Sequence, residues 1–348
     1  MERRLRIVLK MIFLFIGHLY ICWNLNISIL WTFIVSSIGT FIISFVAFVI
    51  RLPNFIKNWY YISMAYFGIF IELIISSFIF HVLQITRVVS KDNKGKWILI
   101  LATVLFAYGY INAHMIYVNT VDIKIKKLKS STCIAHLTDL HIGCAYGKQF
   151  VEKICKKLAE IKPDFVVITG DLYDGSIEYD YTAIEPFDRL SFPVYLILGN
   201  HDLLHIQEIL KVMKKSKMIL MNDEVHVRGE LKLIGLQFRN KCPNLTTTLK
   251  ELQVLPDTTN ILLYHSPAYT ADDLAEVGIS LHLAGHTHGG QLFPIHIIQA
   301  LKYKYLSGLH HSKKKDAWVY VSEGLGTTGS PLRIGTKSAI DVIRLHGN

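Results

Sequence analysis

The chain has 348 residues, of which 51% are hydrophobic and 18% are charged, with a mean hydropathy of +0.34 and a formal net charge of +10. Globular chains carry roughly 25% charged residues, so this composition argues against a wholly soluble protein and indicates that part of the chain lies in a bilayer. The basic residues are scattered and are not interleaved with aromatic residues, so nucleic acid is not expected, and anionic lipid headgroups are the favoured partner. The five scattered cysteines form no CxxC pair, which excludes a disulfide framework and a thiolate zinc site.

Four apolar stretches in the first third of the chain predict membrane-spanning helices, at residues 7–22, 27–50, 60–83 and 97–118. A helix rises about 1.5 Å per residue, so about 20 apolar residues cover the roughly 30 Å hydrocarbon core. The first stretch is short and contains Lys10 and His18, but the residues after it do not form a signal-peptide cleavage site. Residues 1–118 are therefore predicted to be a multi-pass membrane region.

Basic residues beside these stretches bear on membrane orientation. Arg3, Arg51 and Lys124 favour a cytoplasmic N-terminus and a cytoplasmic C-terminal domain, because positive residues accumulate on that side. Arg87 and Lys94, between the third and fourth stretches, argue for the opposite side. The balance favours the cytoplasmic side, and an odd number of spans would reverse it.

The sequence pattern changes after residue 118. Residues 119–130 alternate between apolar and charged side chains and predict a linker or a first strand, and residues 131–348 predict a second domain. In that domain, short apolar runs predict buried strands at 133–138, 165–169, 194–198, 231–236, 260–264, 281–284 and 318–322. Amphipathic stretches between them predict helices at 148–161, 184–190, 204–214 and 271–277. The alternation predicts an α/β fold.

Side chains that can bind metals cluster where five of these strands end. They are Asp139 and His141, Asp171 and Asp174, Asn200, His201 and Asp202, His265, and lastly His286 and His288. Because the carboxyl ends of strands form the ligand crevice of an open α/β sheet, these side chains are expected to meet at one edge. Carboxylate, imidazole and amide oxygen suit Mn, Fe or Zn. Two such ions about 3.5–4 Å apart can bind a phosphate and a hydroxide together, and a bridging carboxylate would hold them that close.

At these residues the sequence resembles the calcineurin-like metallophosphoesterase superfamily. The family pattern is DxH, GDxxD, GNH(D/E), a lone His and GHxH, and it stands here as Asp139–His141, Gly170–Asp174, Gly199–Asp202, His265 and Gly285–His288. All five blocks occur in order, and the resemblance covers about residues 130–345. It implies a sandwich of two mixed sheets with helices on the outer faces.

The resemblance also implies a role for each of these residues. The seven implied metal ligands are Asp139, His141 and His288 for one ion, Asn200, His265 and His286 for the other, and Asp171 as the bridge between them. His201 would lie over the substrate phosphate and stabilise or protonate the leaving group. Asp174 and Asp202 would orient neighbouring groups. The implied cofactors are two divalent ions, Mn, Fe or Zn.

The glycine-rich segment 324–333 and Gly289–Gln291 are similar to the membrane-associated branch of this superfamily, which includes UDP-2,3-diacylglucosamine-type phosphoesterases. The same segment matches GxGxxG, but Pro331 opposes the helix that a dinucleotide site requires. Arg333 could clamp a substrate phosphate or form a structural salt bridge, and both interpretations stay open.

These features predict a membrane-anchored, dinuclear phosphoesterase. It would hydrolyse a phosphomonoester, phosphodiester or pyrophosphate bond by attack of a metal-bridging hydroxide, in a lipid-linked or nucleotide substrate. The alternative is a catalytically silent metal-binding sensor or scaffold on a membrane helix bundle. The substrate, the metal and the oligomeric state are left open by the sequence.

Overall fold

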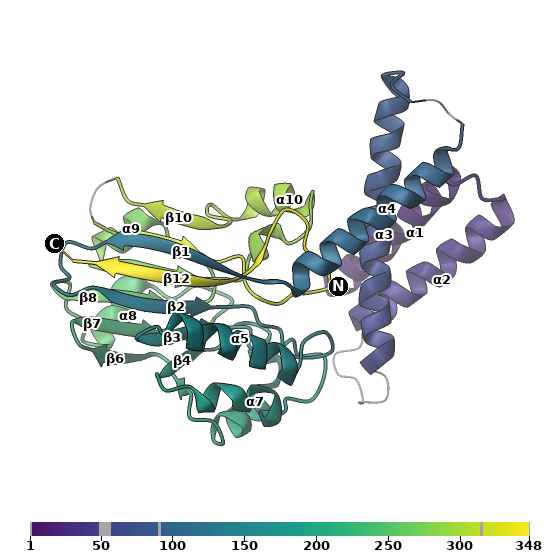
Figure 1. Cartoon of the computed structure of the whole chain (residues 1–348). Helices are drawn as coiled ribbons and strands as arrows, with labels where there is room; N and C mark the ends of the chain where they lie inside the picture. The colour runs from purple at the N-terminus through teal and green to yellow at the C-terminus, as the bar shows by residue number, and fades with distance from the viewer. Residues whose placement is uncertain (1, 49–56, 90–91, 314–315, 348) are drawn as a thin grey trace. The chain divides into compact units, whose positions relative to one another are not determined.

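The computed structural model describes residues 2–48, 57–89, 92–313 and 316–347 and divides into two compact units (Figure 1). A helical unit comprises Met1–Asn112 with Gly329–Leu332, and an α/β unit comprises Ala113–Thr328 with Arg333–Asn348. Arg51, used above for the orientation, and the end of the expected 27–50 span lie outside the described residues.

Four helices form most of the first unit: α1 (Glu2–Asn24), α2 (Ile29–Phe48), α3 (Lys57–Ile85) and α4 (Lys94–His114). Two of them are long and apolar enough to cross a membrane, over Asn58–Ile85 and Lys94–His114, and α1 and α2 contain shorter apolar segments. Helices α1 and α3 are joined by a hydrogen-bonding contact of 2.9 Å between His18 Nε2 and the Tyr66 hydroxyl. These apolar helices indicate association with a membrane.

The first sheet of the α/β unit has the strand order β1–β12–β2–β3–β4–β5. Its strands are β1 (Ile116–Lys124), β2 (Thr132–Leu137), β3 (Phe165–Thr169), β4 (Val194–Ile197), β5 (Ile219–Leu220) and β12 (Ser338–His346). Strands β2 to β5 are parallel, and β12 runs antiparallel to β2. Strand β1 begins at Ile116, inside the stretch expected to be the fourth span, because these residues pair along their whole length with β12.

The second sheet has the order β10–β11–β9–β8–β7–β6. Its strands are β6 (Glu224–Arg228), β7 (Leu231–Gly235), β8 (Thr259–Leu263), β9 (Leu281–Ala284), β10 (Gly308–His311) and β11 (Trp318–Val321). Strands β7, β8, β9 and β11 are parallel, with antiparallel strands β6 and β10 at the two edges. Both sheets are therefore mixed, as the sequence predicted.

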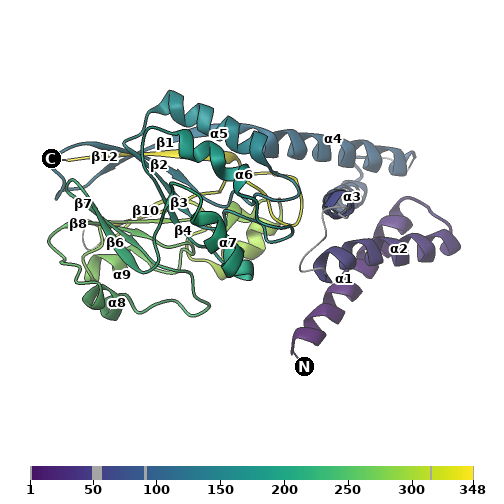
Figure 2. The same ribbon diagram turned by 90° about the horizontal axis from the view of Figure 1, so that it is seen from below.

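Helices cover the outer faces of the two sheets (Figure 2). On the first sheet lie α5 (Lys148–Ile161), the short α6 (Tyr181–Ile184) and α7 (Ile206–Met213), and on the second lie α8 (Leu245–Glu251) and α9 (Ala271–Glu276). Helix α5 buries Val151, Ile154 and Leu158, the spacing of an amphipathic helix. A third apolar layer, which includes Ile134, Leu263 and Ile343, fills the space between the sheets. The predicted two-sheet sandwich flanked by helices is confirmed.

One carboxyl group is buried in the layer between the sheets. Asp341 on β12 accepts hydrogen bonds from the Tyr320 hydroxyl at 2.7 Å and from Asn119 Nδ2 at 3.1 Å. Burial raises the pKa of Asp341 to about 6, because the charged form loses its hydration.

Asp341 is expected to make the stability of this unit depend on pH. Below about pH 3 the carboxyl group is largely protonated in both the folded and unfolded states. As the pH rises towards 6, the unfolded chain ionises freely and the folded chain does not, so the free energy of unfolding falls by roughly 3 kcal/mol. Asp341→Asn should remove this fall. Thermal unfolding of both proteins in detergent from pH 4 to about 7.5 checks it, and parallel curves would contradict it.

Candidate metal centre

The expected ligands follow directly on the carboxyl ends of parallel strands in both sheets. Strand β2 leads to Asp139 and His141, β3 to Asp171, β4 to Asn200 and His201, β8 to His265, and β9 to His286 and His288. The first sheet thus provides carboxylates, an amide and one imidazole ligand, and the second sheet provides imidazoles only.

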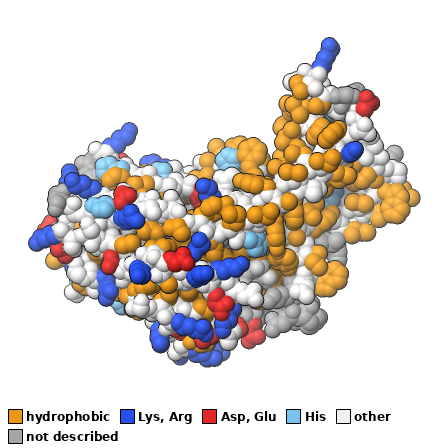
Figure 3. All heavy atoms as spheres, in the orientation of Figure 1, with side chains coloured by type: hydrophobic (Ala, Val, Ile, Leu, Met, Phe, Trp, Pro, Cys, Tyr) orange, Lys and Arg blue, Asp and Glu red, His pale blue; other side chains and the backbone are white. Residues whose placement is uncertain are grey.

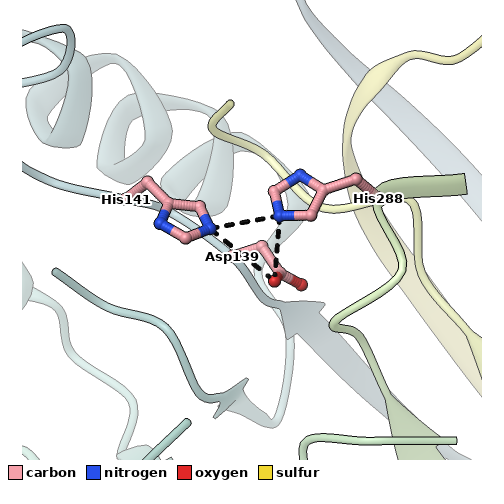
Figure 4. Close-up of side chains that lie close together, drawn as sticks. All are labelled: Asp139, His141 and His288. Atoms are coloured by element: carbon pink, nitrogen blue, oxygen red, sulfur yellow. Dashed lines mark hydrogen bonds and ion pairs between the residues drawn. The ribbon is translucent and has the colours of Figure 1, made fainter. Parts of the chain in front are cut away.

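Three overlapping groups of side chains each bring three possible ligand atoms within 4.8 Å of one another: Asp139, His141 and His288; His141, Asp171 and His201; and Asp171, His265 and His286. Figure 4 shows the first group, in which both imidazole rings turn a nitrogen towards the carboxylate of Asp139. His141 Nε2 lies 3.1 Å from His288 Nε2, and His288 Nε2 lies 3.3 Å from Asp139 Oδ1. Two imidazole lone pairs this close favour a cation between them.

Asp171 lies between the two ends of the cluster. Its Oδ2 atom is 3.8 Å from His141 Nε2 and 3.3 Å from His265 Nε2. His265 Nε2 is in turn 3.2 Å from His286 Nδ1. One carboxylate oxygen therefore faces both sets of imidazoles, which is the arrangement that a bridging ligand requires.

Backbone groups orient both carboxylates in the same way. The Asp139 Oδ2 atom accepts from the Thr138 hydroxyl and from the backbone N–H of His286, at 2.8 and 2.9 Å. The Asp171 Oδ1 atom accepts from the backbone N–H of His201 at 2.8 Å. Each carboxylate is thus held by one oxygen and presents the other to the imidazoles, so both are oriented before any ion binds.

Two further observations fit bound cations. His265 Nδ1 contacts the carbonyl oxygen of Thr169 at 2.7 Å, and donation there leaves the lone pair on Nε2, facing Asp171. Among the described residues, the Asn200 Oδ1 atom is buried and has no hydrogen-bond partner. A buried carbonyl oxygen without a donor is costly, and a metal ion would satisfy it.

The electrostatics of the cluster match this ligand set at three residues, Asp171, His141 and His286. His265 is the exception: burial alone would lower its pKa, but the Asp171 carboxylate raises that pKa to about 9, so a metal ion at Nε2 would have to displace a proton. Burial alone would raise the pKa of Asp171, but the imidazoles of His265, His201 and His141 hold that pKa below its usual value. Burial and the neighbouring His201 lower the pKa of His141 well below 6.5, and burial and His265 lower that of His286 to about 4. The carboxylate is thus ionised and these two imidazoles are neutral near pH 7, the states that metal binding needs.

Five candidate ligand residues have left-handed backbone conformations: Asp139, His141, Asp171, His286 and His288, with φ between 48° and 73°. Non-glycine residues adopt this conformation rarely, although Asp and His do so more often than most. The DxH and GHxH motifs did not predict this backbone conformation. Such strain accumulates at functional sites, where the surrounding structure enforces it.

His201, expected over the substrate, packs edge-on against the His141 ring at 4.8 Å between centroids. Its Nδ1 atom contacts the backbone carbonyl oxygen of Asp174 at 2.8 Å. The Asp174 carboxylate instead accepts from Ser176, and that of Asp202 accepts from the backbone N–H groups of Tyr173 and Gly199. Asp174 therefore orients His201 through its main chain.

Arg333 has a completely buried side chain. Its Nη2 atom donates to the carbonyl oxygens of Glu323 and Gly326, both at 2.7 Å, and lies 3.5 Å from His288 Nδ1. Its Nη1 atom donates to the Thr336 hydroxyl. These contacts support a structural role beside His288 more than a phosphate clamp.

Two aromatic residues that the sequence analysis missed also border the centre. The Phe238 ring lies 5.8 Å from the His265 ring and 5.9 Å from the His286 ring, and Tyr303 lies 5.7 Å from His286. Phe238 follows strand β7 and Tyr303 follows the helix Ile295–Lys302, and neither element carries a metal-binding motif. Only the tertiary fold places these two rings beside the candidate ligands.

Gly199 lies so close to Asp171 that a side chain cannot be accommodated. A methyl group at Gly199 would lie 2.5 Å from the Asp171 backbone nitrogen and closer still to its Oδ1 atom. Gly199→Ala should therefore displace the bridging carboxylate and lower metal content and hydrolysis by roughly 10–100-fold. Gly147→Ala, where nothing lies within 4 Å, is the matched control. Equal metal content in the two variants would refute the expectation.

Comparison with known proteins agrees with the geometry. Residues 133–290 match the family model described as calcineurin-like phosphoesterase. An uncharacterized metallophosphoesterase of Campylobacter jejuni is 32% identical over 263 residues, which are 72% of this chain and 69% of that protein. A transmembrane protein with metallophosphoesterase domain of Danio rerio is 28% identical over 321 residues, 82% of this chain and 73% of its own. A Caenorhabditis elegans relative is 29% identical over 269 residues, and the match spans 70% of this chain and 56% of that protein's length.

Two mixed sheets with candidate carboxylate and imidazole ligands at their strand ends are the arrangement that the family resemblance implied. With the matches above, the chain belongs to the calcineurin-like metallophosphoesterase family.

Proposed function

We propose that this chain hydrolyses a phosphoester bond with two divalent ions, Mn, Fe or Zn, held by the residues at the strand ends. Asp139, His141 and His288 would hold one ion, Asn200, His265 and His286 the other, and Asp171 would bridge them. When bound, such ions supply Lewis acidity and lower the pKa of an attacking water. The position of Asp171 Oδ2 between His141 and His265 carries the proposal.

His201 is proposed to act on the leaving group. The Nδ1–H group donates to the Asp174 carbonyl oxygen, so the ring can deliver a proton from Nε2 when it is the doubly protonated imidazolium. Water oxygen bonds to phosphorus as the phosphorus–oxygen bond to the leaving group breaks, and the Nε2 proton of the His201 imidazolium passes to the departing oxygen. The attacking water gives up one proton to solvent, and the His201 ring takes one proton back from solvent, so the turnover restores the starting state. The Asp171 and Asp139 carboxylates, fixed by backbone N–H groups, keep their orientation throughout.

The proposal extends to the membrane. The chain would be a multi-pass protein with four spans, its α/β unit on the cytoplasmic side, acting on a phosphorylated and lipid-linked substrate. Two helices of sufficient length and hydropathy, and a zebrafish relative named a transmembrane protein, support this.

The decisive experiment is hydrolysis of bis-p-nitrophenyl phosphate by the purified full chain, with and without added Mn, and with Asp171→Asn as the reference. Metal-dependent turnover in the wild type alone supports the proposal. Metal bound without turnover on monoester, diester and pyrophosphate substrates would favour a silent sensor or scaffold instead.

A further inference from the structure

Helix α10 (Ile295–Lys302) differs from the other helices of the α/β unit because none of its residues is buried. Ile297, Ile298 and Leu301 are 54%, 68% and 87% exposed, and Phe293 just before the helix is 46% exposed. Figure 3 shows hydrophobic side chains gathered over the position that α10 has in Figure 1. By contrast, α5, α7, α8 and α9 each bury an apolar face.

The helix is nevertheless held firmly beside the metal centre. The backbone of His296 packs so closely on Gly290 that a side chain there would overlap it. The Tyr303 ring, directly after the helix, contacts the ring of His286 at 5.7 Å. The exposed isoleucines and Leu301 therefore belong to a packed helix. Tyr303, the residue after this helix, contacts the proposed metal ligand His286.

The segment of the chain that contains α10 carries basic and no acidic side chains. No acidic residue occurs between Glu276 and Asp316 in the sequence. Lys302 lies over the Tyr303 ring at 4.8 Å, and Lys304 over the Tyr305 ring at 5.7 Å. Apolar side chains flanked by lysine and tyrosine are typical of helices that lie in the surface of an anionic membrane.

We propose that α10 is an interfacial helix that inserts its apolar side chains into an anionic lipid leaflet. The acid-free segment complements anionic headgroups, and Ile297, Ile298 and Leu301 supply the apolar surface that enters the acyl region. The same chain carries two helices long and apolar enough to cross a membrane, and their insertion would tether the α/β unit to a leaflet. A second copy of this chain would offer α10 the same positive charge and is disfavoured.

Docking of α10 also indicates the substrate class, and this step rests on the proposed function. With α10 in the leaflet, Tyr303 and His286 lie at headgroup depth, where the phosphate of a membrane lipid resides. The Phe238 and Tyr303 rings beside His286 offer apolar surface to the part of a lipid next to its phosphate. We therefore assign a phosphorylated lipid, presented from the leaflet, as the substrate.

The docking is tested without catalysis. The full chain carries a single environment-sensitive fluorophore at Ile298→Cys, in a background with the exposed Cys242 and the partly exposed Cys133 and Cys144 changed to serine. It is reconstituted in vesicles of phosphatidylcholine with phosphatidylglycerol that contain a spin-labelled quenching lipid. Strong quenching at 298 and weak quenching at a Val227→Cys control, itself 66% exposed, is the expected result. Equal quenching at both sites overturns the proposal. Shielding of the fluorophore at position 298 that disappears when the protein is diluted in detergent would indicate contact with a second copy, and it also overturns the proposal.

The substrate class is tested by a double variant, Ile298→Glu with Leu301→Glu, against Val227→Glu as the control. We expect the double variant to retain hydrolysis of soluble p-nitrophenyl phosphate and to lose roughly tenfold of its activity on phosphatidic acid in the same vesicles, because charged residues oppose insertion. Equal losses on both substrates would contradict the presentation step. Absence of all hydrolysis in the wild type would refute the proposed function, while the quenching result would still decide whether α10 docks.

Discussion

Replacing Asp171 with asparagine is expected to leave the fold intact, to remove bound metal and to lower phosphodiester hydrolysis about a thousandfold or more. The carboxylate oxygen that faces both His141 and His265 carries the charge that would hold two cations together. Asparagine keeps the shape and the acceptor for the His201 backbone N–H but loses that charge. Several kcal/mol of charge stabilisation then disappear, and each 1.36 kcal/mol corresponds to about tenfold in rate.

The measurement combines metal content by mass spectrometry with hydrolysis of bis-p-nitrophenyl phosphate. Asp257→Asn is the matched control, since Asp257 is an exposed aspartate in the loop before β8. Wild-type metal content and turnover in Asp171→Asn would exclude Asp171 as the bridge.

Changing His201 to alanine is expected to separate metal binding from turnover. The ring touches His141, but its Nδ1 atom is engaged by the Asp174 carbonyl oxygen, so the metal ligands should keep their positions. Loss of a positioned acid typically costs 10²–10⁴-fold, roughly. The loss should be largest for alkyl phosphates, whose leaving group needs a proton, and small for p-nitrophenyl phosphate, whose leaving group does not.

The control for this prediction is His205→Ala, four residues later, whose ring packs against Tyr179. It should leave the dependence on the leaving group unchanged. If His201→Ala slows alkyl and nitrophenyl substrates by the same factor, His201 positions the substrate and does not donate the proton.

The sequence predicted the α/β class and the clustering of candidate ligands because both depend on local patterns, whereas the family resemblance implied the two-sheet sandwich. Short apolar runs predicted the buried strands, and Asp139, Asp171 and His265 each follow such a run within two residues. Parallel strands then bring their ends together whatever lies between them. The spacing and polarity of the residues were therefore sufficient to predict the α/β class.

Features that depend on tertiary contacts could not be read in this way. The approach of Phe238 and Tyr303 to His286, and the use of the Asp174 carbonyl oxygen to hold His201, depend on loop paths that no periodicity encodes. Strand β1 shows a second limit: apolar Ile116 suits a helix end as well as a strand, and pairing with β12 decides between them.

The left-handed conformation of five candidate ligand residues affects the expected stability of their loops when no metal is bound. Each such residue costs roughly 1–2 kcal/mol against ordinary backbone, so together they approach the net stability of a whole domain. Ions that bind only the folded loops would offset that cost and would therefore stabilise this edge of the sandwich. Without bound ions, these loops are expected to open at a lower free-energy cost than the paired strands of the two sheets.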